Sequence, residues 1–139
     1  MGYKFLDHTA DVKFIAEEKT LESAFIESAY ALKETICGDI GVLGQDKKNL
    51  EIKGTNLENL LYKFLEEFIF LLDAEDFLIS KIDSLEIDET TNTLKARISG
   101  DNASNYKFTN DVKAITYSEM KIEKDKDKDL WKIIVVLDV

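Results

Sequence analysis

Two carboxylates and the only histidine of the chain occur together near its start, in residues 7–12, which read Asp-His-Thr-Ala-Asp-Val. Short apolar runs, residues 3–6 and 12–16, flank this segment, and both are candidates for strands. Carboxylate oxygens bind cations, and an imidazole can hydrogen-bond a ligand or transfer a proton. A polar cluster at the junction of two strands indicates a functional site more readily than a core.

The other end of the chain supplies further oxygens. Residues 133–137 read Ile-Ile-Val-Val-Leu and predict a buried central strand, followed by Asp138 and Val139. If this strand lies beside the one that starts at Val12, three carboxylates converge, namely Asp11, Asp138 and the α-carboxylate of Val139. Three negative charges so close together repel unless they are neutralised. A hard divalent cation with oxygen ligands would neutralise them, and this predicts a metal site.

His8 has a natural place beside such a metal, where it could hydrogen-bond a ligand carboxylate. The competing interpretation is that Asp11 caps a turn, Asp138 is exposed, and His8 is a hydrogen-bonded polar residue without further function. Spacing alone favours this second interpretation.

Composition limits the class of protein. The 139 residues fit a single domain, residues 1–139, and the formal net charge of −10 disfavours direct nucleic-acid binding through the general surface. Cations or a basic protein partner suit such a surface better. The single cysteine, Cys37, indicates a reducing compartment. We find no signal peptide pattern and no membrane span, so we expect a cytoplasmic protein.

The order of the predicted elements favours an α+β fold. A helix should run from an N-cap at Thr20 to about residue 36, and a second from a capping box at Thr55 and Glu58 to about residue 72. Strands are predicted at residues 3–6, 12–16, 50–53, 77–87, 94–98, 112–122 and 131–139. Residues 41–48 and 100–110 should be loops. We expect two main helices packed on a mostly antiparallel sheet.

A second acidic segment is a weaker metal candidate. Asp125, Asp127 and Asp129 imitate the start of a calcium-binding EF-hand loop, but Leu130 and Val136 stand where that loop needs glycine and glutamate. We interpret this segment as a solvated hairpin tip.

Four segments together resemble the archease family: residues 7–12, 57–72, 111–117 and 135–139. The similarity runs nearly end to end. It implies an α+β fold of two interleaved strand–helix–strand–strand units. It also implies a divalent metal, usually seen as calcium, with Mg²⁺ or Mn²⁺ as alternatives, held by Asp11, Asp138 and Val139. Family members assist an RtcB-type tRNA-splicing RNA ligase in forming its guanylylated histidine and in multiple turnover.

Two segments depart from the family's pattern. Ser118 follows the Thr-Tyr pair where many archeases have histidine, and residues 100–110 lack the usual arginine and histidine. Partner contacts at these positions could therefore differ. Lys113 matches the family's lysine. It is our candidate for a functional cation that contacts the partner, although an ordinary strand lysine is an equally weighted interpretation.

Three hypotheses for function remain. The leading one is a non-enzymatic activator of the RNA ligase. The second is a metal-dependent hydrolase with His8 as general base, which lacks a second acid–base partner or a nucleophile at a sensible spacing. The third, also implied by the resemblance, is a chaperone-like modulator of a tRNA cytosine methyltransferase.

Overall fold

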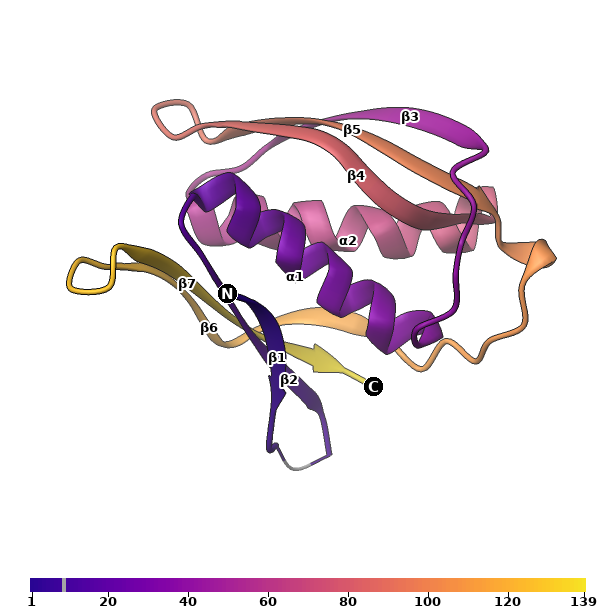
Figure 1. The fold of residues 1–139 in the computed structure, drawn as a ribbon, viewed down its shortest axis with the longest axis horizontal. Helices are drawn as coiled ribbons and strands as arrows, with labels where there is room; N and C mark the ends of the chain where they lie inside the picture. Colours follow the sequence, from indigo (N-terminus) through magenta and orange to yellow (C-terminus); the bar gives the residue numbers. More distant parts are fainter. Residues whose placement is uncertain (9) are drawn as a thin grey trace.

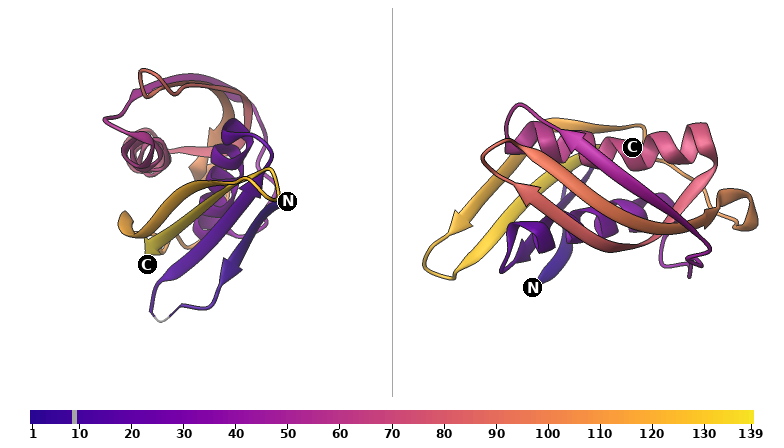
Figure 2. Two further views of the ribbon diagram at one scale, coloured as in Figure 1. Left: turned by 90° about the vertical axis from the view of Figure 1, so that its left-hand side faces the viewer. Right: turned by 90° about the horizontal axis from the view of Figure 1, so that it is seen from above.

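The fold places two helices between two antiparallel sheets. In the computed structural model, which describes residues 1–8 and 10–139, the described residues form two α-helices and seven strands. Sheet A has the strand order β1-β2-β7-β6, and sheet B has the order β3-β5-β4. Figure 1 shows sheet B above the helices and sheet A below them, and the end-on view in Figure 2 shows the same layers. The α+β prediction is confirmed.

Sheet A joins the two ends of the chain. Its strands are β1 (Gly2–Leu6), β2 (Val12–Glu18), β6 (Ala114–Asp125) and β7 (Leu130–Asp138). β7 lies between β2 and β6, as its continuous apolar sequence predicts for a central strand. The tip between β6 and β7 is a tight turn in which Asp125 accepts a hydrogen bond from the Asp127 amide, which confirms the hairpin prediction.

Sheet B is a three-stranded layer within the part of the chain described. Its strands are β3 (Asp46–Lys53), β4 (Phe77–Asp88) and β5 (Thr93–Asn102). The loops predicted at residues 41–48 and 100–110 are longer than those in the structure, because β3 starts at Asp46 and β5 runs to Asn102. Neither strand end has an apolar pattern, because the start of β3 is mostly exposed and the end of β5 buries the polar residues Ser99 and Asp101.

Both helices contribute large buried side chains to the core. α1 (Leu21–Cys37) begins at the predicted N-cap Thr20, whose side chain accepts from the Ser23 amide at 3.0 Å. α2 (Leu57–Glu75) runs one turn past its predicted end. The rings of Phe64 and Phe25 meet between the helices, with centroids 5.9 Å apart. The described residues contain no helix that is long and apolar enough to cross a membrane.

The predicted capping box of α2 is wrong by one residue. Asn56, and not Thr55, is the N-cap, and its side chain accepts from the Asn59 amide at 2.8 Å. Asn59 in turn accepts from the Thr55 amide at 3.0 Å, so it replaces Glu58 in the reciprocal contact. Asparagine caps at least as well as threonine, which explains the shift.

Gly100 in β5 allows sheet B to pack closely. A Cβ atom at this position would lie 2.5 Å from Cζ of Phe77 and even closer to the Leu78 carbonyl oxygen. We predict that Gly100→Ala lowers the free energy of unfolding by about 1–3 kcal/mol through overpacking. Urea denaturation measures this change. Gly41→Ala is the matched control, because nothing lies within 4 Å of its added methyl group. Equal midpoints for the two variants would contradict the prediction.

Candidate functional site

The predicted metal ligands lie at the same end of sheet A. Val12 pairs with Leu137, and Ala114 pairs with Asp138 on the other side of β7. Continuing the antiparallel register by one residue sets Asp11 opposite Asp138. Side chains directly opposite each other share a face, with Cβ atoms about 4.5–5.5 Å apart. The predicted pairing of the strand that starts at Val12 with the last strand is therefore confirmed, whereas the convergence of the carboxylates stays a prediction.

The end of the chain is held in place. The Asp138 carbonyl oxygen accepts a hydrogen bond from the Lys113 amide at 2.7 Å. Val139 is partly buried and packs against the core, and Asp138 is also partly buried. The exposed Lys113 side chain lies at the level of Val139 in the register. These contacts bring Lys113 to the same sheet end as the two aspartates.

A cavity of about 330 Å³ opens beside Asp11. Apolar side chains of β1 and β2 and two polar residues of α1 line it: Phe5, Leu6, Asp11, Val12, Lys13, Glu34 and Thr35. Asp11 is partly exposed there. Asp11 directly precedes β2, whose first residue, Val12, pairs with Leu137 of β7.

His8 makes its contact with β6. Its Nε2 lies 2.8 Å from Oε2 of Glu119, and Lys13 Nζ donates to Oε1 of the same carboxylate at 2.9 Å. Glu119 thus ties the segment after β1 to strand β2 and to β6. Thr9, which follows His8 in the predicted motif, lies outside the described residues.

Glu119 was missed by the sequence reasoning, although a signal for its position exists. It lies in a bulge of β6, where the pairing with β7 shifts between Thr116 and Lys121, and its φ is 56°. Apolar residues occupy odd positions at Ile115 and Tyr117 and even positions at Met120 and Ile122. Because alternate residues of a strand face opposite sides, this change of parity marks an inserted residue.

The charges around Glu119 favour its ionised form. The hydrogen bond from Lys13, followed by the one with His8, holds the pKa of Glu119 below its usual value. The Glu119 side chain is 47% exposed, so solvent screens these charges and the pair stabilises the fold only modestly. Its main effect is on the position of the segment that contains His8.

Among the described residues, no group of three or more His, Cys, Asp or Glu side chains has a metal-binding arrangement. The predicted metal ligands differ from such a group, because they combine the side chains of Asp11 and Asp138 with the α-carboxylate of Val139. It stays a prediction.

Comparison with known proteins gives a family. Residues 3–139 match the family described as "Archease protein family (MTH1598/TM1083)". The chain belongs to the archease family. An archease of Pyrobaculum neutrophilum is 36% identical, with 99% of this chain and 95% of that protein covered. One of Methanosarcina acetivorans is 30% identical with the same coverage. The fish Ictalurus punctatus has one that is 33% identical, over 99% of this chain and 85% of that protein.

A solved structure supports the archease fold. The solution structure of Methanobacterium thermoautotrophicum protein 1598 superposes with a TM-score of 0.83 and 32% identity, covering 99% of both chains. Ser118 lies in β6, and residues 100–110 run from the end of β5 through a short 3-10 helix, Ala103–Asn105, into a loop. Ser118 is exposed next to Glu119 in the β6 bulge. Asp101, in the second departing segment, is buried and accepts from the Tyr106 hydroxyl at 2.7 Å.

The Glu119 contacts predict a pH dependence of stability. Because the pKa of Glu119 is lower in the folded state than in the unfolded state, its contribution is present above the unfolded pKa. It is lost as the pH falls through the folded pKa. We predict that the stability difference between wild type and Glu119→Gln shrinks between about pH 6 and about pH 3, measured by urea denaturation.

Glu86→Gln, on an exposed position of sheet B, is the control and should show no such trend. A difference that stays constant or grows on acidification would show that the contacts of Glu119 do not favour its charged form.

Proposed function

We propose that this protein is a non-enzymatic activator of an RtcB-type tRNA-splicing RNA ligase and that it carries a divalent metal. The single observation that supports the metal is the register that sets Asp11 opposite Asp138 at the end of the chain. Membership of the archease family supports the partner. The ligase performs the chemistry, in which its histidine is guanylylated and the enzyme turns over repeatedly.

The residues present fit a hard cation. Asp11 and Asp138 supply carboxylate oxygens from neighbouring strands, and the α-carboxylate of Val139 follows directly. Ca²⁺ binds oxygens at about 2.3–2.6 Å with flexible geometry, which suits ligands from two strands and a chain end. Mg²⁺ and Mn²⁺ are alternatives. The bound ion would cancel the repulsion between the carboxylates and would hold the two chain ends together.

The metal and the Glu119 contacts would act on the same segment. The ion holds Asp11, and Glu119 holds His8 and Lys13 from the side of β6. Both ends of the connection between β1 and β2 are then fixed, which presents a preorganised surface to a partner. His8 serves here as a positioning residue. The exposed Lys113 offers a cation that could contact a phosphate or an acidic side chain of the ligase.

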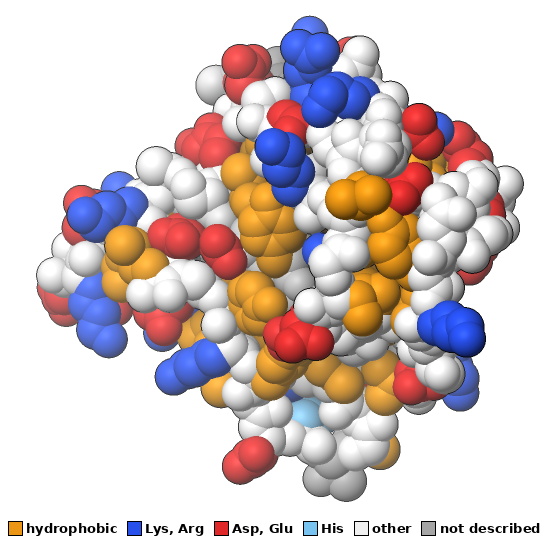
Figure 3. Space-filling model, turned by 45° about the vertical axis from the view of Figure 1, so that its right-hand side comes forward, with side chains coloured by type: hydrophobic (Ala, Val, Ile, Leu, Met, Phe, Trp, Pro, Cys, Tyr) orange, Lys and Arg blue, Asp and Glu red, His pale blue; other side chains and the backbone are white. Residues whose placement is uncertain are grey.

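Aromatic surface on β6 adds contact area close to Glu119. The Tyr117 ring is 51% exposed and stacks on Tyr62 of α2, with centroids 4.4 Å apart. Asn59 donates to the Tyr117 hydroxyl at 2.8 Å and fixes the ring. Rigid, exposed tyrosines are common at protein interfaces. Figure 3 shows hydrophobic side chains reaching the surface between charged ones over a broad area of the molecule.

Calcium titration tests the metal site. We predict that Asp11→Asn and Asp138→Asn each weaken Ca²⁺ binding at least about tenfold, because each removes an anionic ligand. Extension of the chain by one glycine after Val139 should weaken it as well, because the α-carboxylate moves away. Isothermal calorimetry measures all three. Asp127→Asn, in the β6–β7 hairpin, is the matched control with the same change of charge. Equal weakening by this control would place the calcium in the hairpin.

A ligation assay with limiting RNA ligase tests the activity. We predict that wild-type protein increases the number of ligation turnovers and that Asp11→Asn loses most of this effect. Lys113→Ala should reduce it at unchanged calcium affinity. Asp127→Asn should activate like wild type. Equal turnover with wild type and Asp11→Asn would remove the metal from the mechanism.

Two further measurements separate the alternatives. Phosphoesterase activity that requires Asp11 and His8 in the absence of ligase would show a hydrolase instead. Copurification with a tRNA methyltransferase, and not with a ligase, would favour the methyltransferase role.

A further inference from the structure

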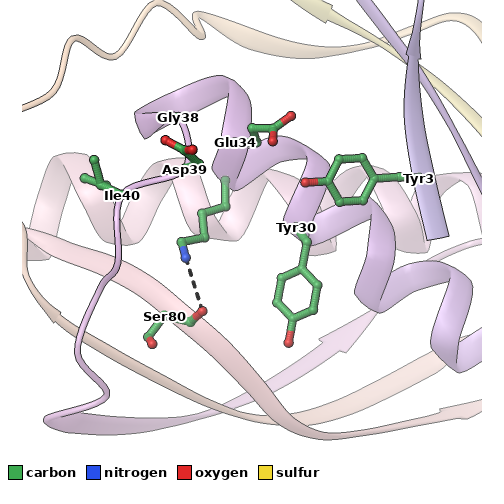
Figure 4. Close-up of a pocket in the computed structure, with 8 residues that line it drawn as sticks. Tyr3, Tyr30, Glu34, Gly38, Asp39, Ile40 and Ser80 are labelled. Atoms are coloured by element: carbon green, nitrogen blue, oxygen red, sulfur yellow. Dashed lines mark hydrogen bonds between the residues drawn. The ribbon is translucent and has the colours of Figure 1, made fainter.

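A second cavity lies on the far side of Glu34 from Asp11. It has a volume of about 350 Å³ and is formed by β1, the C-terminal half of α1, the segment after α1, and β4. Aromatic and charged side chains line it: Tyr3, Tyr30, Lys33, Glu34, Gly38, Asp39, Ile40 and Ser80. Figure 4 shows Tyr3 reaching toward α1 from β1, with Glu34 above it, and Tyr30 pointing from α1 toward β4.

The two tyrosine rings are held in place before any ligand binds. The Tyr30 hydroxyl accepts a hydrogen bond from the Ile82 amide of β4 at 3.1 Å. The Tyr3 ring packs edge-on against Phe5, with centroids 5.8 Å apart. Preorganised aromatic walls lower the entropy cost of binding, because little side-chain freedom is lost.

The electrostatic character of this cavity favours a cation. Glu34 and Asp39 supply two carboxylates, and Lys33, which also lines the cavity, donates to the Ser80 carbonyl oxygen at 3.4 Å. Burial, followed by the negative charges of Glu34 and Glu27, raises the pKa of Tyr3. With a formal net charge of −10 on the chain, an anionic ligand such as a nucleotide is disfavoured here.

We propose that this cavity binds the guanidinium group of an arginine side chain that belongs to a protein partner. A guanidinium is planar, so it can stack on a tyrosine face while it donates two parallel hydrogen bonds to one carboxylate, here Glu34. A lysine ammonium is a compact, strongly hydrated charge and cannot combine these two contacts.

The neighbouring strand makes a peptide the natural source of the arginine. β1 lies at the edge of sheet A and carries Tyr3 at the cavity wall. The edge of a sheet presents backbone groups that can pair with an extended partner segment. A partner segment alongside β1 could place one arginine side chain in the cavity. This inference goes beyond the ligase proposal, because it concerns a different site and its test contains neither ligase nor metal.

An NMR titration of the full chain with the blocked tripeptide acetyl-Gly-Arg-Gly-amide tests the proposal. We expect saturable backbone amide shifts in the millimolar range, centred on Tyr3, Tyr30, Glu34 and Gly38. Free L-arginine should bind more weakly, because its α-carboxylate meets the acidic rim. The same tripeptide with lysine, or with the uncharged isostere citrulline, should bind at least fivefold more weakly.

Matched variants assign the contacts. Glu34→Gln should weaken binding of the arginine tripeptide at least fivefold, whereas Glu22→Gln, the same change at the other end of α1, should leave it unchanged. Tyr3→Phe keeps the ring and should retain most of the affinity, whereas Tyr3→Leu should lose it. Unchanged amide spectra of each free variant outside the cavity show that it folds.

Three results would overturn the proposal. These are the absence of shifts at the cavity with the arginine tripeptide, equal affinity for the lysine tripeptide, and full affinity in Glu34→Gln. Tighter binding of free arginine than of the tripeptide would mean that a small molecule, and not a protein partner, is the ligand.

Discussion

The pairing of β2 with β7 is the contact on which the rest of this structure depends. It runs without a break from Val12 with Leu137 to Glu18 with Trp131, and it joins the first and last parts of the chain. The pairing costs much loop-closure entropy, because nearly the whole sequence lies between the two strands. Buried side chains of β7, such as Ile133, Val135 and Leu137, offset that cost by packing against the helices.

The same pairing makes the candidate site possible. Asp11 and Asp138 are separated by most of the chain, yet the register brings them to one end of sheet A. A shift of one residue in this register would turn the two carboxylates to opposite faces. Buried apolar residues at the centre of β2 and along β7 specify the register, so the hydrophobic core determines at which end of the sheet the two aspartates lie.

The sequence predicted the elements well and their polar ends less well. The periodicity of α1 and α2 and the apolar run of β7 identified these elements, because burial imposes their spacing. The start of β3 was missed because its polar residues are mostly exposed, and the end of β5 was missed because its buried residues Ser99, Gly100 and Asp101 are not apolar. The pairing of β2 with β7 was predictable from their apolar sequences. Glu119 was not, because its contacts with His8 and Lys13 depend on a bulge.

Electrostatics connects these features to function. In a chain of net charge −10, acidic residues that merely keep the protein soluble can spread over the surface and reduce their repulsion. Here the pairing of β2 with β7 brings Asp11 and Asp138 to one end of sheet A, while Glu119 accepts a hydrogen bond from Lys13 and lies 2.8 Å from Nε2 of His8. At Glu119 the fold itself supplies hydrogen-bonding partners, Lys13 and His8, that favour the ionised carboxylate. The proposed calcium ion would supply positive charge to the two carboxylates at the chain end, beside the exposed Lys113.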